Sequence, residues 1–248
     1  MAKGKSMIHC VTTMNKEYYN GIGKVMIATW LEFFPPNYTL HLYLEDFTLD
    51  ISDPRVTIED WNSVNDLFEI WKSTRYSANS RHQKFTLKAL TQIACWRKLK
   101  TGKLIWLDAD TFSINKIPED LCDTVLEKYP LASWGQAQFE SGTVFIDTDH
   151  PDFDDIKNIY ESIYIGDLGL PEGEKWFDGE LLGWACTKAG SKHLNLWKHC
   201  TAKTSTPLNR SWIGNYIRHM KAKQKNTVKE TLINEFNRPD LAQLLESN

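Results

Sequence analysis

The sequence predicts a single α/β domain in which helices flank a mixed, mainly parallel sheet. The first observation is that apolar, β-branched segments alternate with helical segments across the first 110 residues, which is typical of parallel β-α-β units. The second is size and composition. The chain has 248 residues, of which 42% are apolar and 25% charged, as expected for a globular domain with a substantial core.

Local patterns predict the elements in order. Strands are expected where apolar or alternating residues form short segments, at 7–13, 39–44, 56–61, 103–107, 131–134 and 142–146. Helices are expected at 17–34, 81–99, 152–164 and 177–189. Pro35 and Pro36 end the first helix and Gly102 follows the second. The last 40 residues are polar and basic, and no element is assigned to them.

Charge is distributed unevenly along the chain, whose net charge is -3. Residues 71–103 contain nine Lys and Arg and no acid, residues 104–187 contain 18 acids and 4 bases, and bases again exceed acids after 188. This pattern suits the solvated faces of unrelated helices. It equally suits a metal or acid site beside a cradle for an anion.

Several classes of protein are disfavoured. No G-x-G-x-x-G follows the first strand and no G-x-x-x-x-G-K-[ST] occurs, so common dinucleotide and P-loop sites are not expected. The sequence contains no run of 18 apolar residues, so no membrane-spanning helix is expected. The five cysteines form no C-x-x-C pair and the N-terminus is a poor secretory signal. We therefore expect free thiols and a cytoplasmic protein, in the host cytoplasm if it is viral.

One of three Asp-x-Asp pairs has an unusual context. Asp108 and Asp110 directly follow the apolar strand LIWL, whereas the pair at 152 and 154 lies at a predicted helix start, where acids complement the helix dipole. The context of the pair at 147 and 149 is less clear. Two adjacent carboxylates repel each other unless a cation lies between them, and their oxygens suit Mg²⁺ or Mn²⁺. The alternative is a surface turn with two solvated acids.

Four segments together resemble the glycosyltransferases of the GT-A fold. LIWLDAD, with RHQKFTLKALTQIACWRKL before it, is similar to that family's metal-binding segment, and FESGTVFID, WFDGELLGWA and SWIGNYIRHMK resemble its later motifs in the same order. The resemblance covers residues 7–221. It implies a single Rossmann-like GT-A domain at 1–248, with a nucleotide-sugar half at 7–115, an acceptor and catalytic half at 116–225, and a tail at 226–248. Glu140 departs from the family, in which Asn is common.

The resemblance also implies roles for individual residues. The metal ligands would be Asp108, Asp110 and His219, holding Mn²⁺ or Mg²⁺. The contacts to the donor would be Thr12, Thr13, Arg81, Lys84, Asp108 and Lys221. Asp178 and Glu180 would be the catalytic or acceptor-positioning carboxylates, and their apolar flanks predict partial burial. Acids at a helix start are also common dipole partners.

The expected function is metal-dependent transfer of a sugar from a UDP-sugar to an acceptor hydroxyl. One candidate acceptor is 5-hydroxymethylcytosine in phage DNA, because the small size resembles phage enzymes of that kind and the basic segments would suit a polyanion. A glycan, lipid or protein acceptor is the alternative. A metal-dependent nucleotidyltransferase also uses paired carboxylates, and a binding protein without turnover is a third class.

Overall fold

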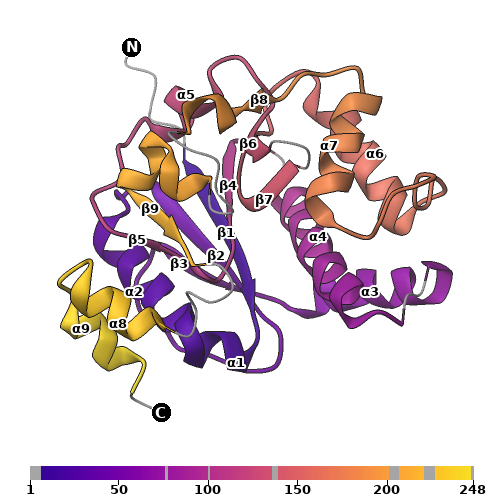
Figure 1. Cartoon of the computed structure of the whole chain (residues 1–248). Coiled ribbons are helices and arrows are strands. Elements are labelled where there is room, and N and C mark those ends of the chain that lie inside the picture. The colour runs from indigo at the N-terminus through magenta and orange to yellow at the C-terminus, as the bar shows by residue number, and fades with distance from the viewer. Residues whose placement is uncertain are drawn as a thin grey trace.

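A seven-stranded sheet forms the centre of the protein (Figure 1). The computed structural model describes residues 7–75, 78–99, 101–135, 139–200, 207–220 and 227–246. The strand order is β3-β2-β1-β4-β7-β6-β8. The bounds are β1 (Ile8–Met14), β2 (Tyr38–Leu44), β3 (Val56–Glu59), β4 (Lys103–Leu107), β6 (Leu131–Gly135), β7 (Phe139–Asp147) and β8 (Leu194–Asn195). A separate two-stranded ribbon pairs β5 (Thr111–Ser113) with β9 (Ile217–His219).

The sheet is mixed and mainly parallel. Strands β3, β2, β1 and β4 run parallel to one another, β7 pairs antiparallel with both β4 and β6, and β8 is parallel to β6. The predicted fold class is therefore confirmed. Because β1, β2 and β4 are parallel neighbours, their carboxyl ends meet at one edge of the sheet, where loops can form a ligand site.

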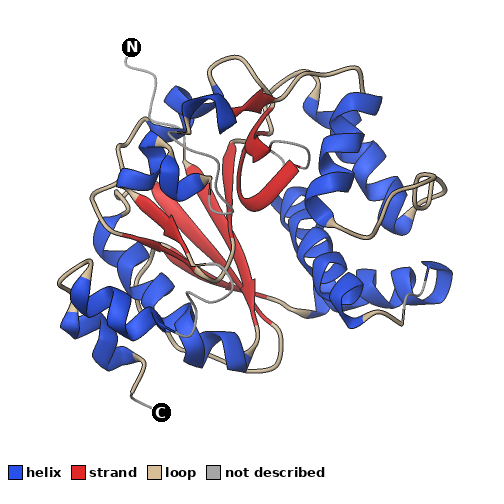
Figure 2. Ribbon diagram, in the orientation of Figure 1, coloured by secondary structure: helices blue, strands red, loops and turns tan. Residues whose placement is uncertain are grey.

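Helices cover both faces of the sheet (Figure 2). One face carries α2 (Lys24–Phe33), which follows α1 (Lys16–Tyr18) and a π-helical turn (Tyr19–Gly23), and α5 (Leu121–Leu126). The other face carries α3 (Asn62–Arg75), α4 (Ser80–Leu99), α6 (Phe153–Ile165) and α7 (Asp178–Lys188). All four predicted helices are confirmed, although the π-helical turn interrupts the first. Helix α3 was not anticipated from the sequence pattern.

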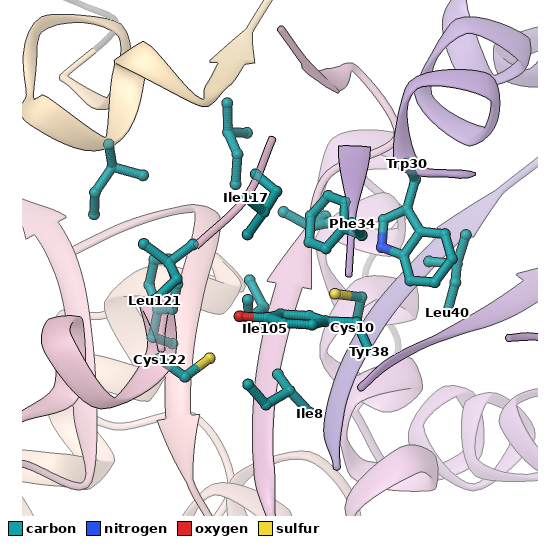
Figure 3. Packing of buried hydrophobic residues seen from close by; sticks show 14 of the residues in the cluster. Ile8, Cys10, Trp30, Phe34, Tyr38, Leu40, Ile105, Ile117, Leu121 and Cys122 are labelled. Atoms are coloured by element: carbon teal, nitrogen blue, oxygen red, sulfur yellow. The ribbon is translucent and has the colours of Figure 1, made fainter. Parts of the chain in front are cut away.

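Side-chain alternation along the strands creates one core on each face. In β4, Ile105 and Leu107 pack toward α2, whereas Leu104 and Trp106 pack toward α3 and α4. Figure 3 shows part of the first of these cores, where Trp30 of α2 and Phe34, the residue after this helix, pack with Leu40 and Ile105 of the sheet. A strand with both faces covered reads as a continuous apolar run, which explains the LIWL segment.

The C-terminal segment contains two short helices. Helices α8 (Val228–Asn234) and α9 (Pro239–Leu244) pack in a third apolar cluster with Val25 of α2 and Phe112 of β5. All five cysteines are free thiols. Within the described residues, no helix is both long enough and apolar enough to cross a membrane.

Three neighbouring strands carry a linked row of titratable side chains. His9 Nδ1 of β1 lies 2.9 Å from His41 Nε2 of β2, and His41 Nδ1 lies 2.7 Å from Glu59 Oε1 of β3. Lys98 of α4 closes the row with a 2.5 Å ion pair to Glu59. Burial, together with the nearby charge of His41, lowers the pKa of His9 from 6.5 to about 4.

This row predicts a pH-dependent stability. Between about pH 4 and pH 6.5, the unfolded chain binds a proton at His9 and the folded chain does not, so the free energy of unfolding rises with pH through this window. After allowing for the partial solvent exposure of His9, we expect its lowered pKa to change the free energy of unfolding by on the order of 1–3 kcal/mol across this window. His9→Gln should lose less stability than the wild type between pH 7 and pH 4.5 in urea unfolding. Equal losses, or an imidazole that titrates near pH 6.5 by NMR, would contradict this assignment.

Candidate active site

A pocket of about 250 Å³ opens at the carboxyl edge of the sheet. Thr13 and Asn15 at the end of β1 and Glu45 after β2 line one part of it. Helix α4 contributes three cations, and the end of β4 contributes two carboxylates. These residues are Arg81, Lys84, Lys88, Asp108 and Asp110. The pocket therefore combines a cationic wall with an acidic one.

Asp108, Asp110 and His219 form a cluster able to hold a metal ion. One ligand atom from each lies within 4.8 Å of the others. His219 Nε2 lies 3.0 Å from Asp110 Oδ1 and 3.9 Å from Asp108 Oδ2. The two segments meet because β9 pairs with β5, which places His219 opposite Thr111, the residue after Asp110. A contact between residues more than 100 positions apart thus completes the cluster.

Lys88 connects this cluster to Asp178. Its ammonium nitrogen lies 2.6 Å from Asp108 Oδ1 and 3.2 Å from Asp178 Oδ2, and it donates a 2.7 Å hydrogen bond to the Ser141 carbonyl oxygen. Trp106 Nε1 donates a 2.8 Å hydrogen bond to the same Asp108 oxygen. Lys88 and Asp178 are only 7% and 2% exposed, so each depends on the other for charge compensation.

The electrostatics of the site follow from burial and close charges. Burial raises the pKa of Asp108, the neighbouring Asp110 and Asp178 raise it further, and Lys88 and His219 oppose the rise. Burial lowers the pKa of Lys88, but the carboxylates of Asp108 and Asp178 outweigh burial and raise it above its usual value. Three acids therefore face one lysine and one histidine.

The residues present fit a divalent cation of the Mn²⁺ or Mg²⁺ type. Two carboxylates and one imidazole supply hard oxygen ligands and a nitrogen ligand, and an added positive charge would relieve the repulsion between Asp108 and Asp110. Asp110 and His219 are buried, whereas Asp108 is partly exposed toward the pocket. A cation here could also contact a ligand in the pocket.

The structure brings most of the predicted donor contacts together. Thr13, Arg81 and Lys84 line the pocket beside Asp108. Thr12 does not line it, because its side chain is fully buried within the sheet and the pocket begins at Thr13 and Met14, at the end of the strand. Of the predicted pair, therefore, only Thr13 reaches the pocket. Lys221 lies outside the described residues.

The two predicted carboxylates of α7 have different surroundings. Asp178 is buried and linked to Asp108 through Lys88. Glu180 is partly buried, and burial and the nearby Glu174 raise its pKa. Asp178 is thus part of the charged network, while Glu180 lies on the same helix two residues further along.

Sequence reasoning missed Lys88 as a site residue. Its signal was present, because Arg81, Lys84 and Lys88 are spaced by three and four residues and so share one face of α4. Asn209 was also missed. Its side chain accepts from the His219 N–H at 2.7 Å and donates to the His219 carbonyl oxygen at 2.9 Å. No local pattern marks an asparagine for this role.

The fold resembles that of known glycosyltransferases. The structure of the bifunctional glycosyltransferase WbbM matches with a TM-score of 0.54 and 11% identity, covering 98% of this chain and 52% of WbbM. The chain has the GT-A fold. It spans about half the length of the WbbM chain that it matches.

Two other solved structures match with lower TM-scores. Mouse xyloside xylosyltransferase 1 matches with a TM-score of 0.48 and 13% identity, covering 76% of this chain and 84% of that one. GlyE from Streptococcus pneumoniae TIGR4 matches with a TM-score of 0.49 and 12% identity, and the match covers 98% of this chain and 61% of the GlyE chain. No protein-family model and no curated protein matches the sequence. The structural likeness to WbbM therefore supports the fold, and the site must support the function.

Proposed function

We propose that this GT-A protein is a metal-dependent glycosyltransferase that uses a nucleotide sugar, with UDP as the expected nucleotide. One observation carries the proposal: a cluster able to bind a divalent cation adjoins a pocket whose other wall is cationic. A diphosphate needs both features, because Mg²⁺ and Mn²⁺ bind carboxylates and phosphates together and basic side chains bind the remaining oxygens.

Each residue has a role in this proposal. Transfer breaks the bond between the anomeric carbon and the diphosphate oxygen, whose electron pair leaves with the diphosphate, while the acceptor oxygen bonds to the sugar and loses its proton. Asp108, Asp110 and His219 would hold the cation, which supplies positive charge to the leaving diphosphate. Arg81 and Lys84 would bind its oxygens. Lys221 is proposed as a further diphosphate contact.

The acceptor side includes Asp178 and Glu180. Asp178 is ion-paired with Lys88, so we propose that it positions Lys88 against Asp108 and the pocket. Glu180, whose pKa is raised, is the proposed catalytic or acceptor-positioning carboxylate. Glu180→Gln should therefore affect transfer to the acceptor more than binding of the donor.

The distribution of basic side chains favours a glycan, lipid or protein acceptor over DNA. Three cations of the 71–103 segment line the pocket. Four others form ion pairs with acids: Lys72 with Glu69, Arg97 with Glu161, Lys98 with Glu59, and Lys103 with Asp123. Within the described part of this segment, most of the positive charge is therefore paired with acids or lies in the pocket, and it does not form a dedicated surface for a phosphate backbone. Sugar transfer to DNA containing 5-hydroxymethylcytosine, but not to glycans, would reverse this preference.

Calorimetric titration of UDP in the presence and absence of Mn²⁺ tests the proposal. We expect Mn²⁺ to tighten UDP binding about tenfold or more, since the cation would bridge the carboxylates and the diphosphate. Binding that ignores the ion would contradict the metal role. A clear ion-dependent preference for a nucleoside triphosphate over UDP and UDP-sugars would favour nucleotidyl transfer instead. Turnover of a UDP-sugar with an acceptor would separate an enzyme from a binding protein.

A further inference from the structure

The two carboxylate oxygens of Asp108 face different partners. Oδ1 accepts a 2.8 Å hydrogen bond from the indole Nε1 of Trp106 and lies 2.6 Å from the ammonium nitrogen of Lys88. Oδ2 lies on the side of His219, whose Nε2 is 3.9 Å away. Oδ1 is therefore held by two donors from the protein, and Oδ2 is the oxygen directed toward the candidate metal cluster.

The path of the chain brings the indole to the carboxylate. Trp106 and Asp108 are two residues apart, so their side chains lie on the same side of the chain as it leaves β4. The Asp108 N–H continues the pairing with β7 through a 2.9 Å hydrogen bond to the Gly142 carbonyl oxygen. Trp106 is 1% exposed and packs in the core toward α3 and α4. The main chain of Asp108 is thus fixed by β7, and its side chain is held by a tightly packed ring.

Other buried tryptophans make no such contact. Trp71 of α3 and Trp96 of α4 pack in the same core, and their indole nitrogens have no hydrogen-bond partner among the residues that the structure describes. A buried indole N–H usually finds a partner, because an unpaired one lowers stability. Since this core accepts unpaired indole N–H groups elsewhere, packing alone does not require the hydrogen bond that Trp106 makes.

We propose that Trp106 is a positioning residue for the metal ligand Asp108, in which the indole N–H holds Oδ1 so that Oδ2 is presented to the ion. This inference rests on the proposed function. Both donors hold Oδ1 in the ion-free protein, but only the indole is neutral. A divalent ion repels the Lys88 ammonium, whereas it does not repel a neutral N–H in the same way. Trp106 is therefore the donor that keeps Asp108 in place both before and after the ion binds.

Mn²⁺ affinity of the nucleotide-free protein, measured by calorimetry, tests this inference. Trp106→Phe keeps an aromatic ring in the core and removes the N–H. Partners that orient a metal ligand commonly change metal affinity about 10- to 100-fold, so we expect Mn²⁺ binding about tenfold weaker. Replacement of Trp106 by 3-benzothienylalanine, in which a sulfur atom takes the place of the N–H, keeps the shape of the ring and should weaken binding to the same extent.

The indole signals of the ¹⁵N-labelled protein in NMR spectra give a second readout, which does not depend on affinity. The Trp106 signal is the one that is missing from the spectrum of Trp106→Phe. We expect it to keep the chemical shift of a hydrogen-bonded N–H when Mg²⁺ saturates the protein. A shift to the position of a free indole N–H would show that Trp106 releases Asp108 when the ion binds, and would overturn the inference.

The matched control is Trp71→Phe, which makes the same change in the same core on a helix that does not line the pocket. Its Mn²⁺ affinity should equal that of the wild type, and an equal loss there would make core packing the cause and overturn the role of Trp106. Normal wild-type binding with unchanged affinity in both Trp106 variants would also overturn that role and leave the proposed function intact. Absence of Mn²⁺ and Mg²⁺ binding by the wild type, with or without UDP, would overturn both.

Discussion

Asp110→Asn should abolish the Mn²⁺-dependent part of UDP binding and reduce sugar transfer about 1,000-fold. The substitution keeps the shape of the side chain but removes a charge from the cluster of Asp108, Asp110 and His219. A metal ion supplies several kcal/mol of charge stabilisation to a leaving diphosphate, and each ~1.4 kcal/mol changes a rate tenfold. Calorimetry with UDP and Mn²⁺, followed by a transfer assay, measures both effects.

A matched control is available in the same sequence. Asp149→Asn makes the same change in another Asp-x-Asp pair, at an exposed turn where Asp149 Oδ1 accepts from the Gly102 N–H. We expect it to leave ion-dependent binding unchanged. Thermal unfolding of Asp110→Asn excludes misfolding as the cause of its loss. Retention of ion-dependent UDP binding by a folded Asp110→Asn would mean that the acidic pair is not the metal site.

Lys88→Met should destabilise the protein by about 3–5 kcal/mol. The variant leaves Asp108 and the buried Asp178 without their shared cation, and breaking a buried ion pair by removing one partner typically has this effect. Adding Asp178→Asn to Lys88→Met should restore part of the stability, because it removes one of the two uncompensated charges. Urea unfolding of the single and double variants, with and without Mn²⁺, measures the coupling.

The comparison for Lys88 is a surface lysine. Lys72→Met removes an exposed ion pair with Glu69 on α3 and should change stability by less than about 1 kcal/mol. A similarly small change in Lys88→Met would show that water or a rearranged side chain compensates Asp108 and Asp178. Lys88 would then have no structural role in the acidic cluster.

Much of the fold could be predicted because its signals are local. The run LIWL predicted β4, and the spacing of apolar residues predicted α4, since a covered parallel strand and an amphipathic helix each impose a short period on the sequence. Helix α3 and the C-terminal helices were not predicted. The signal of α3 was nevertheless present, because its apolar residues have helical spacing and Val64, Leu67 and Trp71 are buried on one face. The C-terminal helices are short and are stabilised by packing on the rest of the molecule.

The residues of the candidate site also divide into those that local sequence signals predicted and those that they did not. Asp108 and Asp110 could be selected from three similar pairs because the strand before them is local information. On the basic face of α4, the sequence analysis predicted Arg81 and Lys84 as site residues but did not include Lys88, which lies one turn further along the same face. Thr12 was grouped with Thr13 because both lie near the end of the strand, but Thr12 is fully buried and the lining of the pocket begins at Thr13.

The sequence by itself determined the α/β class, the acidic pair and the cationic helix, because each depends on residues within a few positions of one another. The resemblance to GT-A enzymes grouped His219 and Asp178 with the acidic pair, but only the tertiary structure decided which of these groups are in contact. The pairing of β5 with β9 places His219 beside Asp110, the packing of α7 on α4 places Asp178 against Lys88, and the bare main chain of Gly142 leaves room for the imidazole. Contacts between segments far apart in the chain leave no periodic pattern in either segment, so one sequence read alone cannot place them.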